Sequence, residues 1–267
     1  MTTRTILNRV KRATVALAFV PKKPPENPRE APFLIIGTGF CIHPRGVIAT
    51  CEHVISASVK GDVRELIDRV PDEDKKRELW PIRNVRMANL YALFFETRIS
   101  RQHLVVLPAI MEVAVAKMDS DVGLIRVAQH PAFKDGFPHL EIEEYANVNE
   151  GLDVATCGFP LGNFLQKQLG TLTSSFTRGI LSSIIPSPNA ALEYVDGFQL
   201  DLTAIFGNSG GPVFNWTTGK VFGILQGGPR DTESEILPGI ARAEPVYKIT
   251  DGDTIQQVIT LSVDDFR

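Results

Sequence analysis

Residues 205–215 of the chain read "IFGNSGGPVFN". A single serine, Ser209, follows an asparagine and precedes two glycines, and apolar residues flank the turn on both sides. Glycines allow backbone conformations that other residues avoid, so this composition suits a tight hairpin. It suits equally a nucleophilic serine beside backbone N–H groups that converge on one point. The rest of the sequence has to decide whether Ser209 is a turn residue or a nucleophile.

The composition is that of an ordinary globular protein, with 267 residues of which 43% are hydrophobic and 22% charged. The net charge of −3 gives no reason to expect nucleic acid or an anionic membrane as a partner. No apolar run approaches the roughly 20 residues that span a bilayer, and the short run "ATVALAFV" lacks the cleavage site of a signal peptide. Three cysteines are too few for a disulfide framework. We therefore expect a cytoplasmic protein.

Short apolar runs rich in Val, Ile, Phe and Thr recur along the chain. Examples are "FLIIGTGFCI" and "VGLIRVA" in the first half, and "DVATCGF" and "KVFGILQGG" in the second. Gly, Pro, Asn or Asp bound most of them, a pattern that predicts many short antiparallel strands in a sandwich or barrel. Residues 129–151 have the composition of a loop and separate two series of strands. We therefore predict an all-β fold in two domains, residues 1–135 and 136–267.

Two segments depart from the strand pattern. Residues 59–83 are highly charged, and their apolar residues before Pro71 stand at helical spacing. We predict that they belong to a charged, partly helical insertion in the first domain, which spans about residues 59–103. Near the chain end, Ile255, Val258 and Ile259 share one helical face. This spacing predicts a C-terminal helix on the second domain.

Catalysis by a serine needs a base that takes the hydroxyl proton and a carboxylate that orients the base. His53 follows the apolar run "GVIATC", so it lies at a strand end, on the rim of a barrel. The other four histidines have no catalytic neighbours in the sequence. Asp121 stands directly before the apolar run "VGLIRV", where a short carboxylate points into a cleft. Asp119 stands two residues earlier, so its side chain would point to the same side of an extended chain, and it is the alternative.

Four motifs follow one another in the order "GTGF" (37–40), "ATCEHVI" (49–55), "DVGLIRV" (121–127) and "GNSGGPV" (207–213). In these motifs the chain resembles the trypsin-like serine peptidases of the chymotrypsin fold. In motif style it is most similar to the bacterial high-temperature-requirement proteases. The resemblance implies two antiparallel six-stranded β-barrels with the active site in the cleft between them. It also implies that Ser209 is the nucleophile, that His53 is the general base and then acid, and that Asp121 rather than Asp119 orients His53.

The resemblance further implies how the substrate is held. The N–H groups of Gly207 and Ser209 form the oxyanion hole, and Asn208 shapes the turn between them. The main specificity pocket is lined by the residue about six positions before the nucleophile and by the strand after it, which correspond to Thr203, Leu225, Gln226 and Gly227. Because Thr203 carries no charge, a lysine or arginine gains little there. We expect cleavage after small or apolar residues.

The expected partners are a protein or peptide substrate and, as a hypothesis, a regulatory protein that binds the 59–103 insertion. A solvated surface insertion without a partner is the alternative. No pair of histidines or cysteines has the spacing of metal ligands. We therefore expect neither a metal nor another cofactor, and we expect no nucleic acid and no membrane among the partners.

Two other classes of function fit part of the sequence. A catalytically silent trypsin-fold module would bind a peptide or a partner in the cleft, but it has no chemical reason to retain His53, Asp121, Ser209 and the glycine turn together. An acyl hydrolase of the α/β-hydrolase fold also has a Gly-x-Ser-x-Gly turn. In that fold, however, a helix follows the serine and the chain order is Ser, Asp, His. The prediction is an active serine endopeptidase with a regulatory role.

Overall fold

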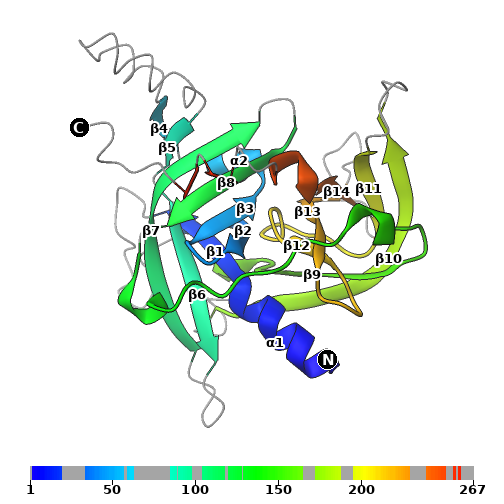
Figure 1. Cartoon of the computed structure of the whole chain (residues 1–267), viewed down its shortest axis with the longest axis horizontal. Helices are drawn as coiled ribbons and strands as arrows, with labels where there is room; N and C mark the ends of the chain where they lie inside the picture. The colour runs from blue at the N-terminus through cyan, green and yellow to red at the C-terminus, as the bar shows by residue number, and fades with distance from the viewer. Residues whose placement is uncertain are drawn as a thin grey trace.

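A computed structural model of the chain describes residues 2–19, 34–56, 59–62, 85–88, 90–97, 104–117, 120–127, 129–164, 172–187, 195–228, 239–250, 255–256 and 258–259. Strands dominate this part of the chain. The first half forms an eight-stranded sheet and the second half a closed barrel, and the two stand side by side in Figure 1.

In chain order, the described helices and strands are α1 (Thr3–Ala13), β1 (Thr14–Phe19), β2 (Leu34–His43), β3 (Val47–Thr50), α2 (Glu52–Ser56), β4 (Val59–Asp62), β5 (Val85–Ala88), β6 (Tyr91–Thr97), β7 (Leu104–Lys117), β8 (Val122–Val127), η2 (Pro131–Phe133), η3 (Tyr145–Asn147), β9 (Asp153–Gly158), β10 (Ser175–Pro186), β11 (Val195–Asp201), β12 (Pro212–Asn215), β13 (Val221–Gly227), β14 (Ala241–Pro245) and η4 (Val246–Ile249).

The first sheet has the strand order β4-β5-β7-β6-β1-β2-β3-β8. An additional pairing between β7 and β8 closes the six strands from β7 to β8 into a ring. The length of β7 makes this closure possible, because residues 104–110 pair with β6 and residues 111–117 continue beside β8. β4 and β5 extend the sheet beyond β7, outside the ring.

The second half of the chain forms a closed barrel with the strand order β10-β11-β14-β13-β12-β9. β11 shows why such a segment is a strand with one buried face. Phe198 and Leu200 are buried, whereas Gln199 and Asp201 between and after them are exposed. Successive side chains of a strand point to opposite faces, so this alternation fills the barrel interior and leaves the polar residues in water.

The predicted all-β fold with two antiparallel barrels is confirmed, with one difference in the first barrel. This sheet has two strands more than the six predicted. β4, β5 and β6 all come from residues 59–103, the segment that was expected to be a partly helical insertion, and β6 is one of the six strands of the ring. Residues 63–84, on which the predicted helix falls, lie outside the described residues. The domain boundary between residues 135 and 136 stays a prediction.

The chain end agrees with the predicted C-terminal helix as far as it is described. Ile255, Gln256, Val258 and Ile259 are helical. Val258 is fully buried in a hydrophobic core cluster against which Ile255 also packs. The other residues of the predicted helix lie outside the described part of the chain.

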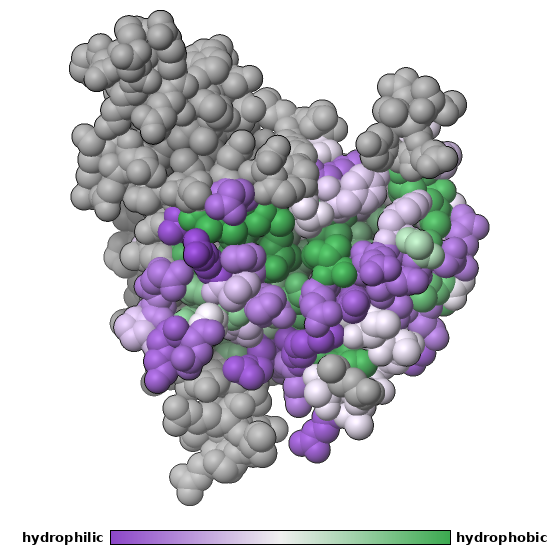
Figure 2. All heavy atoms as spheres, viewed as in Figure 1, coloured by the Kyte–Doolittle hydropathy of each residue, from purple (hydrophilic) through white to green (hydrophobic). Residues whose placement is uncertain are grey.

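The helix α1 is not among the elements predicted from the sequence. The hydroxyl of Thr2 accepts a hydrogen bond from the Thr5 N–H and caps the helix start. Ile6, Val10 and Ala13 form its buried face. Its exposed residues are polar, and hydrophilic atoms cover this region of the surface in Figure 2.

One hydrophobic core cluster joins the two sheets. It contains Leu17 and Phe40 of the first sheet, Phe214 and Ile224 of the second, and Val10 of α1. Apolar side chains of both sheets are thus buried against each other, which favours a fixed mutual position of the barrels. A site that takes residues from both barrels requires such a position.

Candidate active site

Ser209 lies in the turn between β11 and β12, three residues before β12 begins at Pro212. The turn depends on two glycines with left-handed backbone angles, Gly207 (φ 96°) and Gly210 (φ 86°). A Cβ atom on Gly207 would stand 2.3 Å from the carbonyl oxygen of Phe159, and one on Gly210 would stand 2.1 Å from that of Thr38. Both obstacles are backbone atoms, so the turn requires glycine on either side of Ser209.

Thr38, in β2, attaches this turn to the first sheet. Its backbone N–H donates to the carbonyl oxygen of Ser209 at 2.8 Å. Its buried hydroxyl donates to the carbonyl oxygen of Gly207 at 2.5 Å and accepts from the N–H of Phe159 at 3.1 Å. In the sequence, Thr38 stands out only as a member of the "GTGF" motif, which predicts no role for its side chain. The structure makes it the residue that holds the serine turn against the neighbouring barrel.

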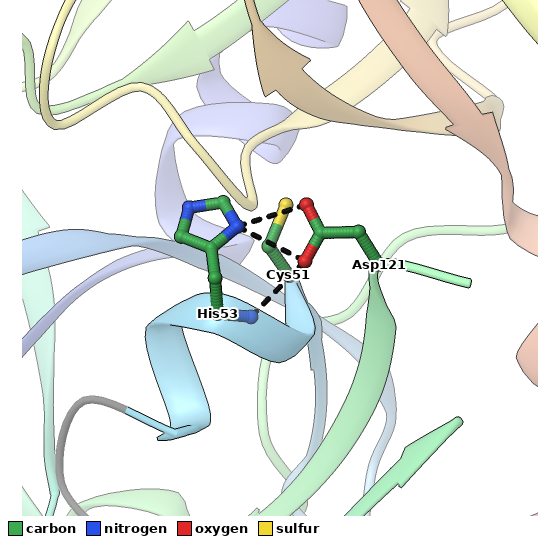
Figure 3. A group of neighbouring side chains, drawn as sticks. All are labelled: Cys51, His53 and Asp121. Carbon is green, nitrogen blue, oxygen red and sulfur yellow. Dashed lines mark hydrogen bonds and ion pairs between the residues drawn. The ribbon is translucent and has the colours of Figure 1, made fainter. Parts of the chain in front are cut away.

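His53 and Asp121 meet at the ends of two neighbouring strands. β3 pairs with β8 with Thr50 opposite Gly123, so the residues that follow β3 lie beside those that precede β8. Nδ1 of His53 is 2.9 Å from Oδ1 and 2.8 Å from Oδ2 of Asp121 (Figure 3). The backbone N–H of His53 also donates to Oδ1, at 3.0 Å. The predicted pair is therefore in contact, while the alternative Asp119 lies outside the described residues.

The surroundings of Asp121 favour its charged form. Partial burial by itself would raise the pKa of Asp121. The hydrogen bonds from the ring and the backbone of His53, the attraction to that ring whenever it is protonated, and the nearby Cys51 thiol together hold the pKa below its ordinary value. An ionised carboxylate only accepts hydrogen bonds, so Nδ1 of His53 carries the proton of the neutral ring. The lone pair is then at Nε2, the atom that acts as base in a catalytic triad.

The hydroxyl of Ser209 donates to the carbonyl oxygen of Gln226 at 2.8 Å. Among the described residues, no hydrogen bond joins Ser209 to His53. Catalytic hydrogen bonds are often long or poorly aligned before substrate binds and tighten only in the complex. Rotation about the Cα–Cβ bond of Ser209 is the movement that would release the hydroxyl from Gln226.

Gln226, in β13, lies between the serine and the aspartate. Its carbonyl oxygen accepts from Ser209, and its side-chain amide stands 3.5 Å from Oδ2 of Asp121. The same amide donates to Oε1 of the buried Glu244 at 2.9 Å, which holds the side chain in place. Gln226 was predicted to line the specificity pocket. The structure gives it, in addition, contacts with two of the three predicted catalytic residues.

The N–H groups of Gly207 and Ser209 donate to no residue that the structure describes. The carbonyl oxygen of Phe206 accepts a hydrogen bond from the N–H of Leu161 at 2.8 Å. Because a peptide unit is planar and trans, the Gly207 N–H points away from that carbonyl and so away from Leu161. The N–H of Asn208 is used within the turn, where it donates to Ile205 at 3.1 Å. The turn thus leaves unbonded, among the described residues, the two N–H groups that were predicted to form the oxyanion hole.

The predicted pocket residues differ in their surroundings. Gly227 is beside the serine, because a Cβ atom there would stand 3.9 Å from Oγ of Ser209. Leu225 is fully buried, and its carbonyl oxygen accepts from the N–H of Gly210 at 2.7 Å. Thr203 is exposed. The lining of the specificity pocket stays a prediction.

The cysteines are free and buried. Burial raises the pKa of Cys41 to about 12 and that of Cys157 to about 11, and it raises the pKa of Cys51 well above its ordinary value. Cys51 lies next to the histidine–aspartate pair: its Sγ, Nδ1 of His53 and a carboxylate oxygen of Asp121 are all within 4.8 Å of one another (Figure 3). Within the described part of the chain, these three residues are the group that could hold a metal ion.

Two antiparallel barrels that present a histidine–aspartate pair beside a glycine-flanked serine have the architecture of the chymotrypsin-type serine peptidases. The family model of the trypsin-like peptidase domain matches residues 37–224, which is more than half of the chain. The chain accordingly belongs to the trypsin-like peptidase family. It is a trypsin-like serine protease, as the order of the four motifs predicted.

Among solved structures, the chain is similar to the HtrA-type protease AlgW with decapeptide, with a TM-score of 0.59 and 15% sequence identity. The match covers 97% of this chain and 67% of that one, and it shows a common fold. The predicted likeness to the high-temperature-requirement proteases is confirmed at this level. No curated protein was found to match the sequence. None of the described helices has the length and apolar character needed to cross a membrane.

Proposed function

We propose that the chain is a serine endopeptidase whose catalytic triad consists of Ser209, His53 and Asp121. The Ser209 hydroxyl attacks the carbonyl carbon of the scissile bond while Nε2 of His53 takes its proton, and Asp121 orients the ring and stabilises its charged form. The tetrahedral intermediate expels the amine, which receives that proton from His53, and leaves an acyl group on Ser209. Water activated by His53 then hydrolyses the ester and restores the serine.

The observation that carries this proposal is the contact of 2.8–2.9 Å between Nδ1 of His53 and the carboxylate of Asp121. This contact fixes the tautomer that a general base needs, because it leaves the lone pair at Nε2. His53 and Asp121 come from the first sheet and Ser209 from the second barrel. The bonds from Thr38 to Ser209 and Gly207 hold these two parts of the site together.

We further propose that the N–H groups of Gly207 and Ser209 bind the oxyanion. Neither N–H group has another acceptor among the described residues, which supports this role. The hydrogen bond from the Leu161 N–H to the Phe206 carbonyl supports it too, because it fixes the peptide unit that carries the Gly207 N–H. Loss of one such donor typically lowers kcat by about 10²–10³-fold. Asn208 contributes by closing the turn rather than by facing the intermediate.

The triad is tested by covalent labelling with a fluorophosphonate probe, which reacts with activated serines. Wild-type protein should be labelled, Ser209→Ala should not, and Ser183→Ala on β10 should be labelled like the wild type. His53→Ala should abolish labelling through loss of the base, whereas His139→Ala, outside the triad, should not. Labelling that survives Ser209→Ala would refute the assignment.

A catalytically silent binding module is the second candidate, and one observation favours it. The Ser209 hydroxyl is engaged with Gln226 and not with His53. If that arrangement persists in solution, the wild type will not react with the probe or cleave any peptide. The wild-type protein and the Ser209→Ala variant would then bind uncleaved peptides with the same affinity, a result that distinguishes a silent module from a protease.

We propose a preference for small or apolar residues on the acyl side of the cleaved bond. The support is the uncharged Thr203 and the close approach of Gly227 to Ser209. The AlgW structure contains a decapeptide, and we infer that the cleft of this chain takes an extended peptide as well. A panel of peptides that differ at one position measures kcat/KM for each residue, and a strong preference for arginine or lysine would contradict the proposal.

We also propose a regulatory rather than digestive role, in the cytoplasm, with a protein partner that contacts the insertion at residues 59–103. The support comes from the sequence alone, in the high charge of residues 59–83. Replacing residues 63–84 by a short glycine–serine linker should abolish partner binding and change the rate on a protein substrate. A small peptide substrate should be cleaved at the unchanged rate, because the replacement leaves His53, Asp121 and Ser209 in the sequence and a small peptide does not depend on the partner.

A further inference from the structure

Cys51 has no part in the proposed reaction, yet it contacts the residues that do. It lies between β3 and α2, two residues before His53. Its side chain is fully buried, and the thiol donates to the carbonyl oxygen of Leu225 at 3.3 Å. Its sulfur, Nδ1 of His53 and an oxygen of Asp121 all lie within 4.8 Å of one another (Figure 3). A thiol, an imidazole and a carboxylate are thus gathered at one point.

We propose that Zn²⁺ binds at this point through Sγ of Cys51, Nδ1 of His53 and a carboxylate oxygen of Asp121, and that this binding reversibly inhibits the protease. Zinc accepts sulfur, imidazole nitrogen and carboxylate oxygen as ligands, usually four in tetrahedral geometry. Three protein ligands leave one position for water. The inhibition rests on the proposed triad, whereas the binding of zinc does not.

The distances fit a zinc ion after small movements. Zinc bonds of about 2.0–2.3 Å in tetrahedral geometry place the ligand atoms roughly 3.3–3.6 Å from one another. Nδ1 of His53 and the oxygens of Asp121 are now 2.8–2.9 Å apart, so they separate slightly to admit the ion. The sulfur is at most 4.8 Å from either, so a shift of about 1 Å completes the site.

The ion reaches the site from the solvent-exposed side of His53 and Asp121. The His53 side chain is 52% exposed and that of Asp121 26% exposed, whereas Cys51 lies behind them. On binding, the thiol leaves the carbonyl of Leu225 and releases one proton to solvent. The neutral imidazole keeps one proton in total, which moves from Nδ1 to Nε2 when zinc takes the Nδ1 lone pair.

This change of tautomer explains the inhibition. Nε2 of His53 now carries a proton and has no lone pair, so it cannot accept the proton of Ser209. Asp121, bound to zinc, no longer orients the ring for catalysis. Removal of the metal restores the hydrogen bond from Nδ1 to Asp121 and with it the base at Nε2. Magnesium, which prefers oxygen ligands in octahedral geometry, should not inhibit.

Inhibition is measured as the Zn²⁺ concentration that halves the rate of peptide cleavage, with each variant compared with its own metal-free rate. We expect zinc to inhibit the wild type, excess chelator to restore activity, and Mg²⁺ to have no effect. Cys51→Ala and Cys51→Ser should raise the inhibitory zinc concentration by at least about 10–100-fold, the loss that removal of even an outer-sphere partner causes. Cys41→Ala and Cys157→Ala, which remove buried thiols elsewhere in the core, should be inhibited like the wild type.

Metal binding itself is measured without catalysis, in the Ser209→Ala protein titrated with Co²⁺. Cobalt replaces zinc in such sites, and a cobalt–thiolate bond gives a charge-transfer absorption band in the near ultraviolet. We expect this band in Ser209→Ala and in Ser209→Ala/Cys41→Ala. It should be absent from Ser209→Ala/Cys51→Ala, and added Zn²⁺ should remove it from the other two.

The two measurements separate the metal site from the proposed triad. If the wild type shows no peptidase activity but the cobalt band depends on Cys51, the metal site stands and the proposed function fails. If the protease is active, and Cys51→Ala is inhibited by zinc at the same concentration as the wild type, the proposed site is wrong. Absence of a thiolate band in Ser209→Ala overturns the proposal by itself.

Discussion

Replacing Thr38 by valine tests whether the serine turn is held by the hydroxyl of a residue in the other barrel. Valine has nearly the shape of threonine but can neither donate nor accept a hydrogen bond. The substitution therefore removes the bonds to Gly207 and Phe159 and leaves the packing almost unchanged. Thr38→Ser is the matched control, because it keeps the hydroxyl and loses only the methyl group.

The expected magnitude follows from the two partners. The N–H of the fully buried Phe159 would lose the acceptor Thr38 Oγ1, and a buried unsatisfied donor costs about 1–3 kcal/mol. Loss of the bond to the partly exposed carbonyl of Gly207 adds about 0.5–1.5 kcal/mol. We expect Thr38→Val to lower the free energy of unfolding by about 2–4 kcal/mol. Thr38→Ser should lower it by about 1 kcal/mol, the value of a buried methyl group.

Urea denaturation monitored by fluorescence measures both free energies, and peptide cleavage measures kcat and KM under folding conditions. With the turn released, kcat of Thr38→Val should fall by up to about 10²–10³-fold, the loss caused by one missing oxyanion donor. KM should change less, because the substrate contacts remain. A Thr38→Val protein as stable as Thr38→Ser, with wild-type kcat, would refute the reasoning that the hydroxyl holds the turn.

Three further predictions concern the same site. Gly207→Ala should lower kcat/KM by at least about 10²-fold, because its Cβ would stand 2.3 Å from a backbone oxygen. Gly151→Ala is the control: it also has a positive φ, 82°, but nothing lies within 4 Å of its Cβ, so kcat/KM should stay unchanged. Activity should rise with pH through about 6–7, where imidazoles ordinarily lose their proton. The lowered pKa of Asp121 keeps that carboxylate charged over this range. A flat profile of kcat/KM against pH would argue against a histidine base. The three buried cysteines, with pKa values raised by burial, should not react with a disulfide reagent at pH 8 until the protein is unfolded; rapid reaction of the folded protein would contradict their burial.

The sequence predicts best what is local or repeated along the chain. The strands follow from apolar runs between turn residues, and β11 shows the alternation on which such a prediction rests. His53 and Asp121 are recognisable because each stands at the end of an apolar strand in the order of a known family. Their contact follows once β3 and β8 pair side by side.

Contacts between residues that are far apart in the sequence could not be predicted from it. Thr38 meets Phe159 and Gly207 across 121 and 169 residues of chain, and no periodic pattern links such positions. The direction of the Ser209 hydroxyl toward Gln226 depends on a single side-chain rotation. The strands β4, β5 and β6 were not predicted either, since all three lie within residues 59–103, where the high charge of residues 59–83 favoured an insertion. These features arise from the packing of the two barrels, which is decided only in three dimensions.

The core cluster shared by the two sheets and α1 has a consequence for the unfolding of the chain. Separating the barrels would expose Leu17 and Phe40 on one side and Phe214 and Ile224 on the other, so neither half retains its full core alone. The guanidinium of Arg9 adds a polar link, because it donates to the carbonyl oxygen of Thr218 at 2.8 Å. We therefore expect the chain to melt as one cooperative unit. A proteolytic cut in the connection between the barrels should leave the two fragments associated, with Thr38 still bonded to the serine turn.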